Sequence, residues 1–226
     1  MPGWSLWLVP PESSSLHTAL TTLITTTLPS LFPDTDHPAF HPHITLTADI
    51  PPSTFAEADP QVWLDGLALP EGGGSGIDVV VGGVEVGESF VKKLTLKVEE
   101  GNGGLVELAV WCRAGAVFGG DFEGARSSTT PPSTLTAALS TKILPAVSTA
   151  KQAATSTAAT STADQPPDTQ SDAPNDQNPQ QRERERQERN SWRGTSSVWL
   201  VPTALPVGEW TAVARREIGG LVWVWE

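Results

Sequence analysis

The sequence predicts an α+β fold of two related lobes, interrupted by a disordered insert. Short apolar runs bounded by proline or glycine, typical of strands, alternate with stretches whose apolar residues recur at helical spacing. The opening run Ser5-Leu6-Trp7-Leu8-Val9-Pro10 returns near the end as Ser197-Val198-Trp199-Leu200-Val201-Pro202. Such an echo indicates that the end of the chain rejoins the core formed by its beginning.

Composition limits the classes of function. The chain has 226 residues, a net charge of −12 and one cysteine, Cys112, which excludes an intrachain disulfide. The negative charge argues against long nucleic acid or an anionic membrane as partner, although it is compatible with a small phosphorylated ligand. The chain lacks an apolar run of about 18 residues, and its first residues do not form a basic region followed by an apolar one. We therefore expect a soluble protein without a transmembrane segment or a visible targeting signal.

The first part of the chain follows the pattern strand, helix, strand. Residues 4–9 are an apolar run closed by two prolines, which predicts a buried strand. A helix is predicted after candidate capping serines at positions 13–15, and Pro29 and Pro33 are expected to end it. Its apolar stripe comprises Leu16, Leu20, Leu23, Ile24 and Leu28, with His17 off the stripe as an expected surface residue. Residues 40–47 form the next predicted strand.

A loop, two facing strands and a second helix are predicted next. Residues 50–76 are expected to form a loop with one short helix near Val62, Trp63 and Leu67. Residues 77–86 and 90–98 predict two strands that face each other. Lys92 interrupts the apolar face of the second strand and is either a strand-end residue or a site residue. The following helix has a stripe of Leu105, Leu108, Ala109, Cys112 and Ala116. Cys112 is expected to be a core thiol, because no histidine follows it to activate it.

Residues 127–190 differ in composition from the rest of the chain. Ser, Thr, Ala, Pro, Gln and Asp dominate them, with almost no large apolar residue after Val147. Such a segment cannot bury enough apolar surface to offset its ordering entropy, so we expect it to be disordered. The alternating charges of residues 182–189 argue against a nucleic-acid patch.

Ordered structure is expected to resume at Trp192. A strand over residues 197–202 is followed by a helical pattern through Trp210, Val213, Ala214 and Ile218, and by an apolar strand over 221–225. We therefore expect residues 1–126 and 192–226 to form one discontinuous domain around an insert of residues 127–191.

The strand over residues 40–47 holds the candidate site. Because side chains alternate along a strand, His43 and Thr45 should share one face while Ile44 and Leu46 point to the other. An imidazole beside a hydroxyl can transfer a proton and bind a phosphate oxygen. A zinc site made by His37, His41 and His43 is an alternative, but it lacks a cysteine or carboxylate at the usual spacing, apart from the loop residues Asp34 and Asp36.

These motifs, in this order, resemble the fungal 2′,3′-cyclic-nucleotide 3′-phosphodiesterases of the 2H phosphoesterase superfamily. The matching segments are residues 5–11, 31–34, 40–46, 84–87, 90–96 and 192–202, followed by Trp210. The resemblance covers residues 1–126 and 192–226. It implies a two-lobed 2H phosphoesterase-like fold with pseudo-twofold symmetry, in which each lobe contributes one His-x-Thr/Ser strand to a central cleft.

The resemblance also implies an activity. The family opens 2′,3′-cyclic nucleotides to nucleoside 2′-phosphates and hydrolyses ADP-ribose 1″,2″-cyclic phosphate, a by-product of tRNA splicing. Two histidines serve as acid and base without metal or cofactor. Carried over to this chain, His43 is one catalytic histidine and Thr45 binds the phosphate. A monomer is implied, as is a location in the Golgi apparatus, with the cytoplasm as the alternative.

The sequence departs from the family in one respect. No histidine follows His43, so the second His-x-Ser/Thr motif is missing and the site lacks either the acid or the base. Either the chain is an inactive relative that acts as a nucleotide-binding module, or residues 127–190 replace the segment that carries the motif. The chain is expected to be at best a weak phosphodiesterase, unless Lys92 or Lys93 replaces the missing histidine.

Overall fold

The computed structural model describes residues 3–34, 39–55, 59–70, 76–85, 95–98, 103–129, 134–136, 144–160 and 191–225. The strands are β1 (Trp4–Val9), β2 (His43–Ile50), β3 (Asp78–Glu85), β4 (Thr95–Val98), β5 (Thr134–Thr136), β6 (Ser191–Arg193), β7 (Ser196–Val201), β8 (Ala214–Ile218) and β9 (Val222–Trp225). The α-helices are α1 (Ser15–Thr22), α2 (Leu28–Leu31), α3 (Pro60–Gly66), α4 (Gly103–Val117), α5 (Phe122–Ser128) and α6 (Leu144–Thr160). The described residues also form the π-helix η1 (Leu23–Thr27) and the 3₁₀ turns η2 (Pro52–Phe55) and η4 (Val207–Glu209).

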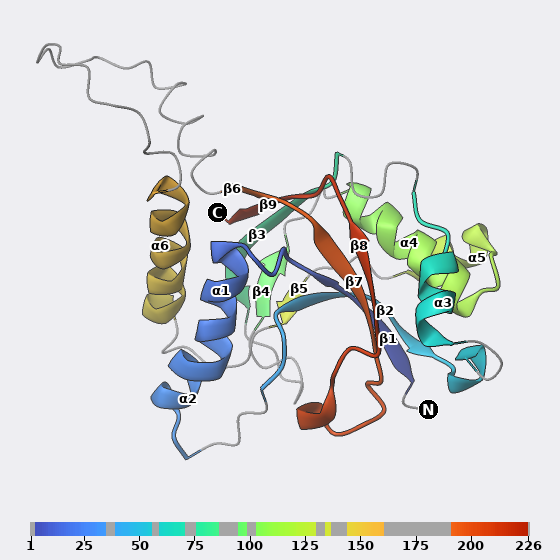
Figure 1. Ribbon diagram of the computed structural model, residues 1–226, viewed down its shortest axis with the longest axis horizontal. Coiled ribbons are helices and arrows are strands. Elements are labelled where there is room, and N and C mark those ends of the chain that lie inside the picture. Colours follow the sequence, from blue (N-terminus) through green and yellow to red (C-terminus); the bar gives the residue numbers. More distant parts are fainter. Residues whose placement is uncertain are drawn as a thin grey trace, which may run out of the picture.

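The strands of the described residues form a single sheet in the order β6-β9-β3-β4-β5-β2-β1-β7-β8. Its pairs are antiparallel except for β3 and β9, which run parallel. In Figure 1, α1 and α6 lie to the left of the central strands and α3, α4 and α5 to the right, and α1 and α4 contribute to the same main core. The predicted α+β class is confirmed. So is the return of the C-terminal segment, because β7 lies directly beside β1.

The two faces of the central strands β1, β2 and β7 are buried in different clusters. Alternate residues enter the main core with α1 and α4, and these are Leu6, Leu8, Ile44, Leu46, Val198 and Leu200. The residues between them on β1 and β7 form a smaller cluster against Trp210 and Ala212, and these are Trp7, Val9, Trp199 and Val201. The alternation of side chains along a strand therefore sets which of these apolar residues reach the second face.

The first predicted helix is confirmed, but it does not end at Pro29. Ser14 caps α1, and its side chain accepts a hydrogen bond from the backbone N–H of His17 at 3.1 Å. A π turn follows, in which the N–H of Leu28 donates to the carbonyl of Leu23. Pro29 then falls in the first turn of α2, where its missing N–H costs little, and the helix continues to Leu31.

Part of the expected insert is ordered, which corrects the disorder predicted for residues 127–191. Residues 134–136 form β5 between β2 and β4, and residues 144–160 form α6, which lies beside α1 (Figure 1). Alanine and lysine are strong helix formers, and small side chains allow two helices to approach closely. Ala154 is fully buried in this contact. Residues 161–190 lie outside the described residues.

The helix predicted through Trp210 and Ile218 is wrong. The chain makes the 3₁₀ turn η4 and then β8, which pairs with β7. Ala214 and Ile218 are buried, and their spacing of four fits both a helix stripe and one face of a strand. The segment is a strand because it pairs with the edge of β7.

The remaining predicted elements are found. The helix α3 and the antiparallel pair of β3 and β4 are confirmed, although residues 86–94, with Lys92 and Lys93, lie outside the described part of the chain. The strand predicted over residues 40–47 begins at His43, after Pro42, which has no N–H for the sheet ladder. No helix among the described residues is long and apolar enough to cross a membrane.

Candidate functional site

Four residues from four neighbouring strands form a row across one face of the sheet. Thr45 of β2 lies opposite Trp7 of β1. Trp7 lies opposite Trp199 of β7, which in turn lies opposite Arg215 of β8. Residues directly opposite each other project from the same face of a sheet, so one continuous surface joins the beginning of the chain to its end. We call this surface the tryptophan face.

His43 lies on the tryptophan face at the start of β2. Its imidazole stacks on the indole of Trp7, with ring centroids 3.6 Å apart and planes 8° from parallel, and Phe40 packs edge-on against it. The side chain is almost fully buried, and burial lowers the pKa of His43 to about 4. His43 is therefore neutral at physiological pH, as a general base must be before it acts.

One hydrogen bond fixes the tautomer of His43. Its Nδ1 lies 2.7 Å from the backbone carbonyl oxygen of His41. A carbonyl oxygen only accepts hydrogen bonds, so in the neutral ring the proton resides on Nδ1. The lone pair of Nε2 remains to accept a proton.

Thr45 follows His43 on the same face, as the alternation in the sequence predicted. Its side chain is partly exposed, whereas Ile44 and Leu46 are buried in the core. A β-bulge lies beyond it, because the register between β1 and β2 shifts between Leu6 and Trp7. The next threonine, Thr47, is buried and accepts a hydrogen bond from Nη1 of Arg113 at 3.2 Å.

A second polar cluster surrounds Trp199. The imidazole of His41 packs edge-on against this indole at 4.7 Å, and the guanidinium of Arg215 lies 3.9 Å from the ring centroid. Arg215 also reaches Glu12 at 3.4 Å. The indole N–H of Trp199 is buried without a hydrogen-bond partner in the described structure. Burial and then the charge of Arg215 lower the pKa of His41, whereas Glu12 raises it.

His17 lies beside this cluster, which corrects the prediction of a solvated surface residue. Its ring is 6.4 Å from that of His41, and it is only partly exposed. Its Nε2 is buried and makes no hydrogen bond within the described residues. Burial is the main cause of the lowered pKa of His17.

The cysteine prediction is confirmed. Cys112 is buried within α4, and burial raises the pKa of its thiol to about 12. A thiol that stays protonated is not a nucleophile. The zinc hypothesis involves His37, which lies outside the described residues. Among those that are described, no group of three or more His, Cys, Asp or Glu is placed to hold a metal ion.

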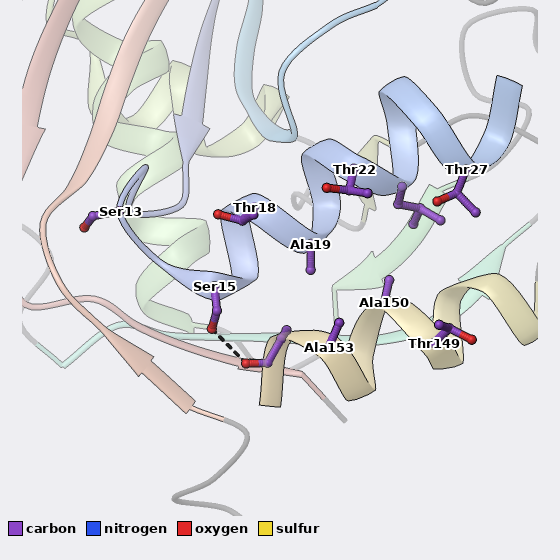
Figure 2. A pocket seen from close by; sticks show the side chains of 11 residues that line it. Ser13, Ser15, Thr18, Ala19, Thr22, Thr27, Thr149, Ala150 and Ala153 are labelled. Carbon is purple, nitrogen blue, oxygen red and sulfur yellow. Dashed lines mark hydrogen bonds between the residues drawn. The ribbon is translucent and has the colours of Figure 1, made fainter. Parts of the chain in front are cut away.

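A groove of about 430 Å³ lies elsewhere, between α1 and α6. Figure 2 shows that its walls carry small side chains from the two helices, including Thr18, Thr22 and Ala150. None of the side chains that line it is ionisable. The groove therefore offers packing space but no group that could transfer a proton or bind a charged ligand strongly.

The sequence had singled out His43 and Thr45 but not the role of their neighbours. The paired indoles were visible only as an echo between the two ends, and no sequence signal placed His41 against Trp199. Arg215 had been assigned to a helix, which would have hidden its position in the row.

An α+β fold with two echoing strands paired at its centre, beside a strand that presents His43 and Thr45, is the arrangement of a 2H phosphoesterase. The family model described as cyclic phosphodiesterase-like protein matches residues 1–218. The chain belongs to that family.

Three curated fungal relatives are named 2′,3′-cyclic-nucleotide 3′-phosphodiesterase. The protein of Phaeosphaeria nodorum is 40% identical over 130 residues, which cover 57% of this chain and 64% of the relative. The protein of Neurospora crassa is 34% identical over 129 residues, covering 54% and 59%. The protein of Yarrowia lipolytica is 36% identical over 117 residues, covering 51% of each chain. The matches thus span between about half and two thirds of the length of these relatives.

Proposed function

We propose that the chain is a 2′,3′-cyclic-nucleotide 3′-phosphodiesterase that produces nucleoside 2′-phosphates. The observation that carries this proposal is His43, a buried, neutral imidazole whose Nδ1 is held by a carbonyl and whose Nε2 is left as a base. Membership of the family and the names of the three relatives support the same reaction.

The chemistry follows from the two side chains on β2. A water molecule attacks phosphorus, its proton passes to Nε2 of His43, and the bond between phosphorus and the 3′ oxygen breaks. The hydroxyl of Thr45 donates a hydrogen bond to a non-bridging oxygen, where negative charge grows in the transition state. The 3′ oxygen must then gain a proton, which leaves a 3′ hydroxyl and a 2′-phosphate.

The finer parts of the proposal come from the family resemblance. They are hydrolysis of ADP-ribose 1″,2″-cyclic phosphate, a role after tRNA splicing, a location in the Golgi apparatus, and action as a monomer without metal or cofactor. For the domain, we propose that residues 1–126 and 192–226 form one unit, to which β5 and α6 add further contacts.

The decisive experiment incubates the purified chain with 2′,3′-cyclic AMP and identifies the product by ³¹P NMR. We expect adenosine 2′-phosphate, formed equally well with a metal chelator, and a loss of about 10²–10⁴ in rate for His43→Asn. A 3′-phosphate product, or full activity of the variant, contradicts the proposal. Binding of the nucleotide without any turnover favours the alternative, a nucleotide-binding module.

A further inference from the structure

The tryptophan face carries a second imidazole that the assigned chemistry does not use. His43 stacks on Trp7, and His41 packs against Trp199. Trp7 and Trp199 lie opposite each other in the antiparallel pairing of β1 and β7. Each indole of this central pair is therefore in contact with one imidazole.

The surroundings of His41 suit an anion. The guanidinium of Arg215 lies over the Trp199 ring, and the buried indole N–H of Trp199 has no acceptor among the described residues. A buried donor without an acceptor costs free energy, which a phosphate oxygen bound there would recover. Among the described residues, the carboxylate that contacts this cluster is that of Glu12, about half exposed and 3.4 Å from Arg215.

On the basis of the proposed function, we propose that His41 donates the proton to the departing 3′ oxygen and replaces the histidine of the missing second motif. Water attacks phosphorus and loses its proton to Nε2 of His43. The bond to the 3′ oxygen breaks as this oxygen takes a proton from His41. Exchange with solvent then removes the proton from His43 and returns one to His41, so the cycle balances without another reactant.

The negative charge of the substrate favours the protonated form of His41, which takes its proton from solvent. In the free protein, burial and Arg215 disfavour its charged form, while Glu12 favours it. The neighbouring imidazoles, His17 and His43, have lowered pKa values and carry little positive charge at neutral pH. A cyclic phosphate is an anion, so its binding beside His41 offsets Arg215 and stabilises the imidazolium.

The His41→Asn variant isolates this role. The backbone carbonyl of residue 41 is retained, so His43 keeps its hydrogen bond and its tautomer. His17→Asn is the matched control, because it removes the other imidazole of the cluster without touching the proposed proton path. Two substrates are compared, 2′,3′-cyclic AMP and catechol cyclic phosphate. The leaving oxygen of the second is phenolic, with a pKa of about 10, and so needs less help from an acid.

We expect His41→Asn to slow hydrolysis of 2′,3′-cyclic AMP by about 10²–10⁴ but that of catechol cyclic phosphate by no more than about tenfold. His43→Asn should slow both substrates alike, and His17→Asn should retain both activities. Equal losses on the two substrates, an unaltered rate for His41→Asn, or an equal loss for His17→Asn would overturn the proposal.

The same experiment separates this inference from the proposed function. Hydrolysis of catechol cyclic phosphate that depends on His43, without hydrolysis of 2′,3′-cyclic AMP, shows that the base is right and the assignment of His41 is wrong. Turnover of neither substrate contradicts the proposed function itself.

Discussion

Trp7 and Trp199 lie opposite each other at the centre of the pairing between β1 and β7, although they come from opposite ends of the chain. Both side chains are almost fully buried. Each contacts a histidine, so the two indoles form the base on which the candidate site rests. A site built in this way needs both ends of the chain to be folded.

Thr45→Val tests the phosphate contact. The substitution preserves the shape of the side chain but removes its hydroxyl. The free energy of binding a nucleoside 2′-phosphate should therefore become less favourable by about 1–3 kcal/mol, with little change in the free energy of unfolding. Thr47→Val is the matched control. It makes the same change on the same strand, but the hydroxyl that it removes accepts a hydrogen bond from Arg113. Calorimetric titration of both variants provides the measurement. Unaltered affinity of Thr45→Val would remove Thr45 from the site.

The buried His43 predicts a loss of stability at acid pH. Its pKa of about 4 in the folded chain lies below its value of 6.5 when unfolded, so the unfolded chain binds more protons between these values. The free energy of unfolding should therefore fall by roughly 3 kcal/mol as the pH drops from 6.5 to 4. Urea denaturation at several pH values measures this slope. His43→Asn should flatten it, and an unchanged slope would show that other groups cause it.

Cys112 should be inert in the folded protein. Its thiol is buried and its pKa is raised to about 12, so almost no thiolate is present at pH 8. A chromogenic disulfide reagent should react slowly under native conditions and at once in guanidinium chloride. The chain has one cysteine, so the signal has a single source. Rapid native reaction would mean that α4 does not pack as described.

Ser15 is predicted to hold α6 against the rest of the fold. Its hydroxyl donates to the carbonyl of Ala154 and accepts from the indole N–H of Trp192, both at 2.8 Å. Ser15→Ala leaves the buried indole without an acceptor, so the free energy of unfolding should fall by about 1–3 kcal/mol. Cleavage of α6 by a protease should become faster. Ser13→Ala, at an exposed position nearby, is the control and should change neither quantity.

Local pattern was enough to predict β1, α1, β2, α3 and α4, because each has an apolar run or an apolar periodicity next to polar, glycine or proline residues. It also placed His43 and Thr45 on one face. The pattern failed for β8, because the spacing of Ala214 and Ile218 fits both a helix and a strand. Only the pairing with β7 makes this segment a strand. It failed for α6 as well, because Ala154 becomes buried only when α6 packs on α1.

The site was only half predictable for the same reason. His43 and Thr45 lie two positions apart, so predicting a strand is enough to place their side chains on the same face. The contacts of Trp199 with His41 and Arg215 join the neighbouring strands β7 and β8 to a segment near the beginning of the chain. Such contacts follow from strand order, and a single sequence shows strand order only where an echo such as that of β1 and β7 reveals it.

The position of β1 between β2 and β7 has a consequence for synthesis. A ribosome adds about 5–20 residues per second, so β1 waits for on the order of ten seconds or longer before β7 emerges. Until then, one edge of β1 has unpaired N–H and carbonyl groups and apolar side chains, which can pair with another chain. The nascent protein should therefore depend on chaperones, and loss of the last 35 or so residues should yield an aggregating chain rather than a smaller folded one.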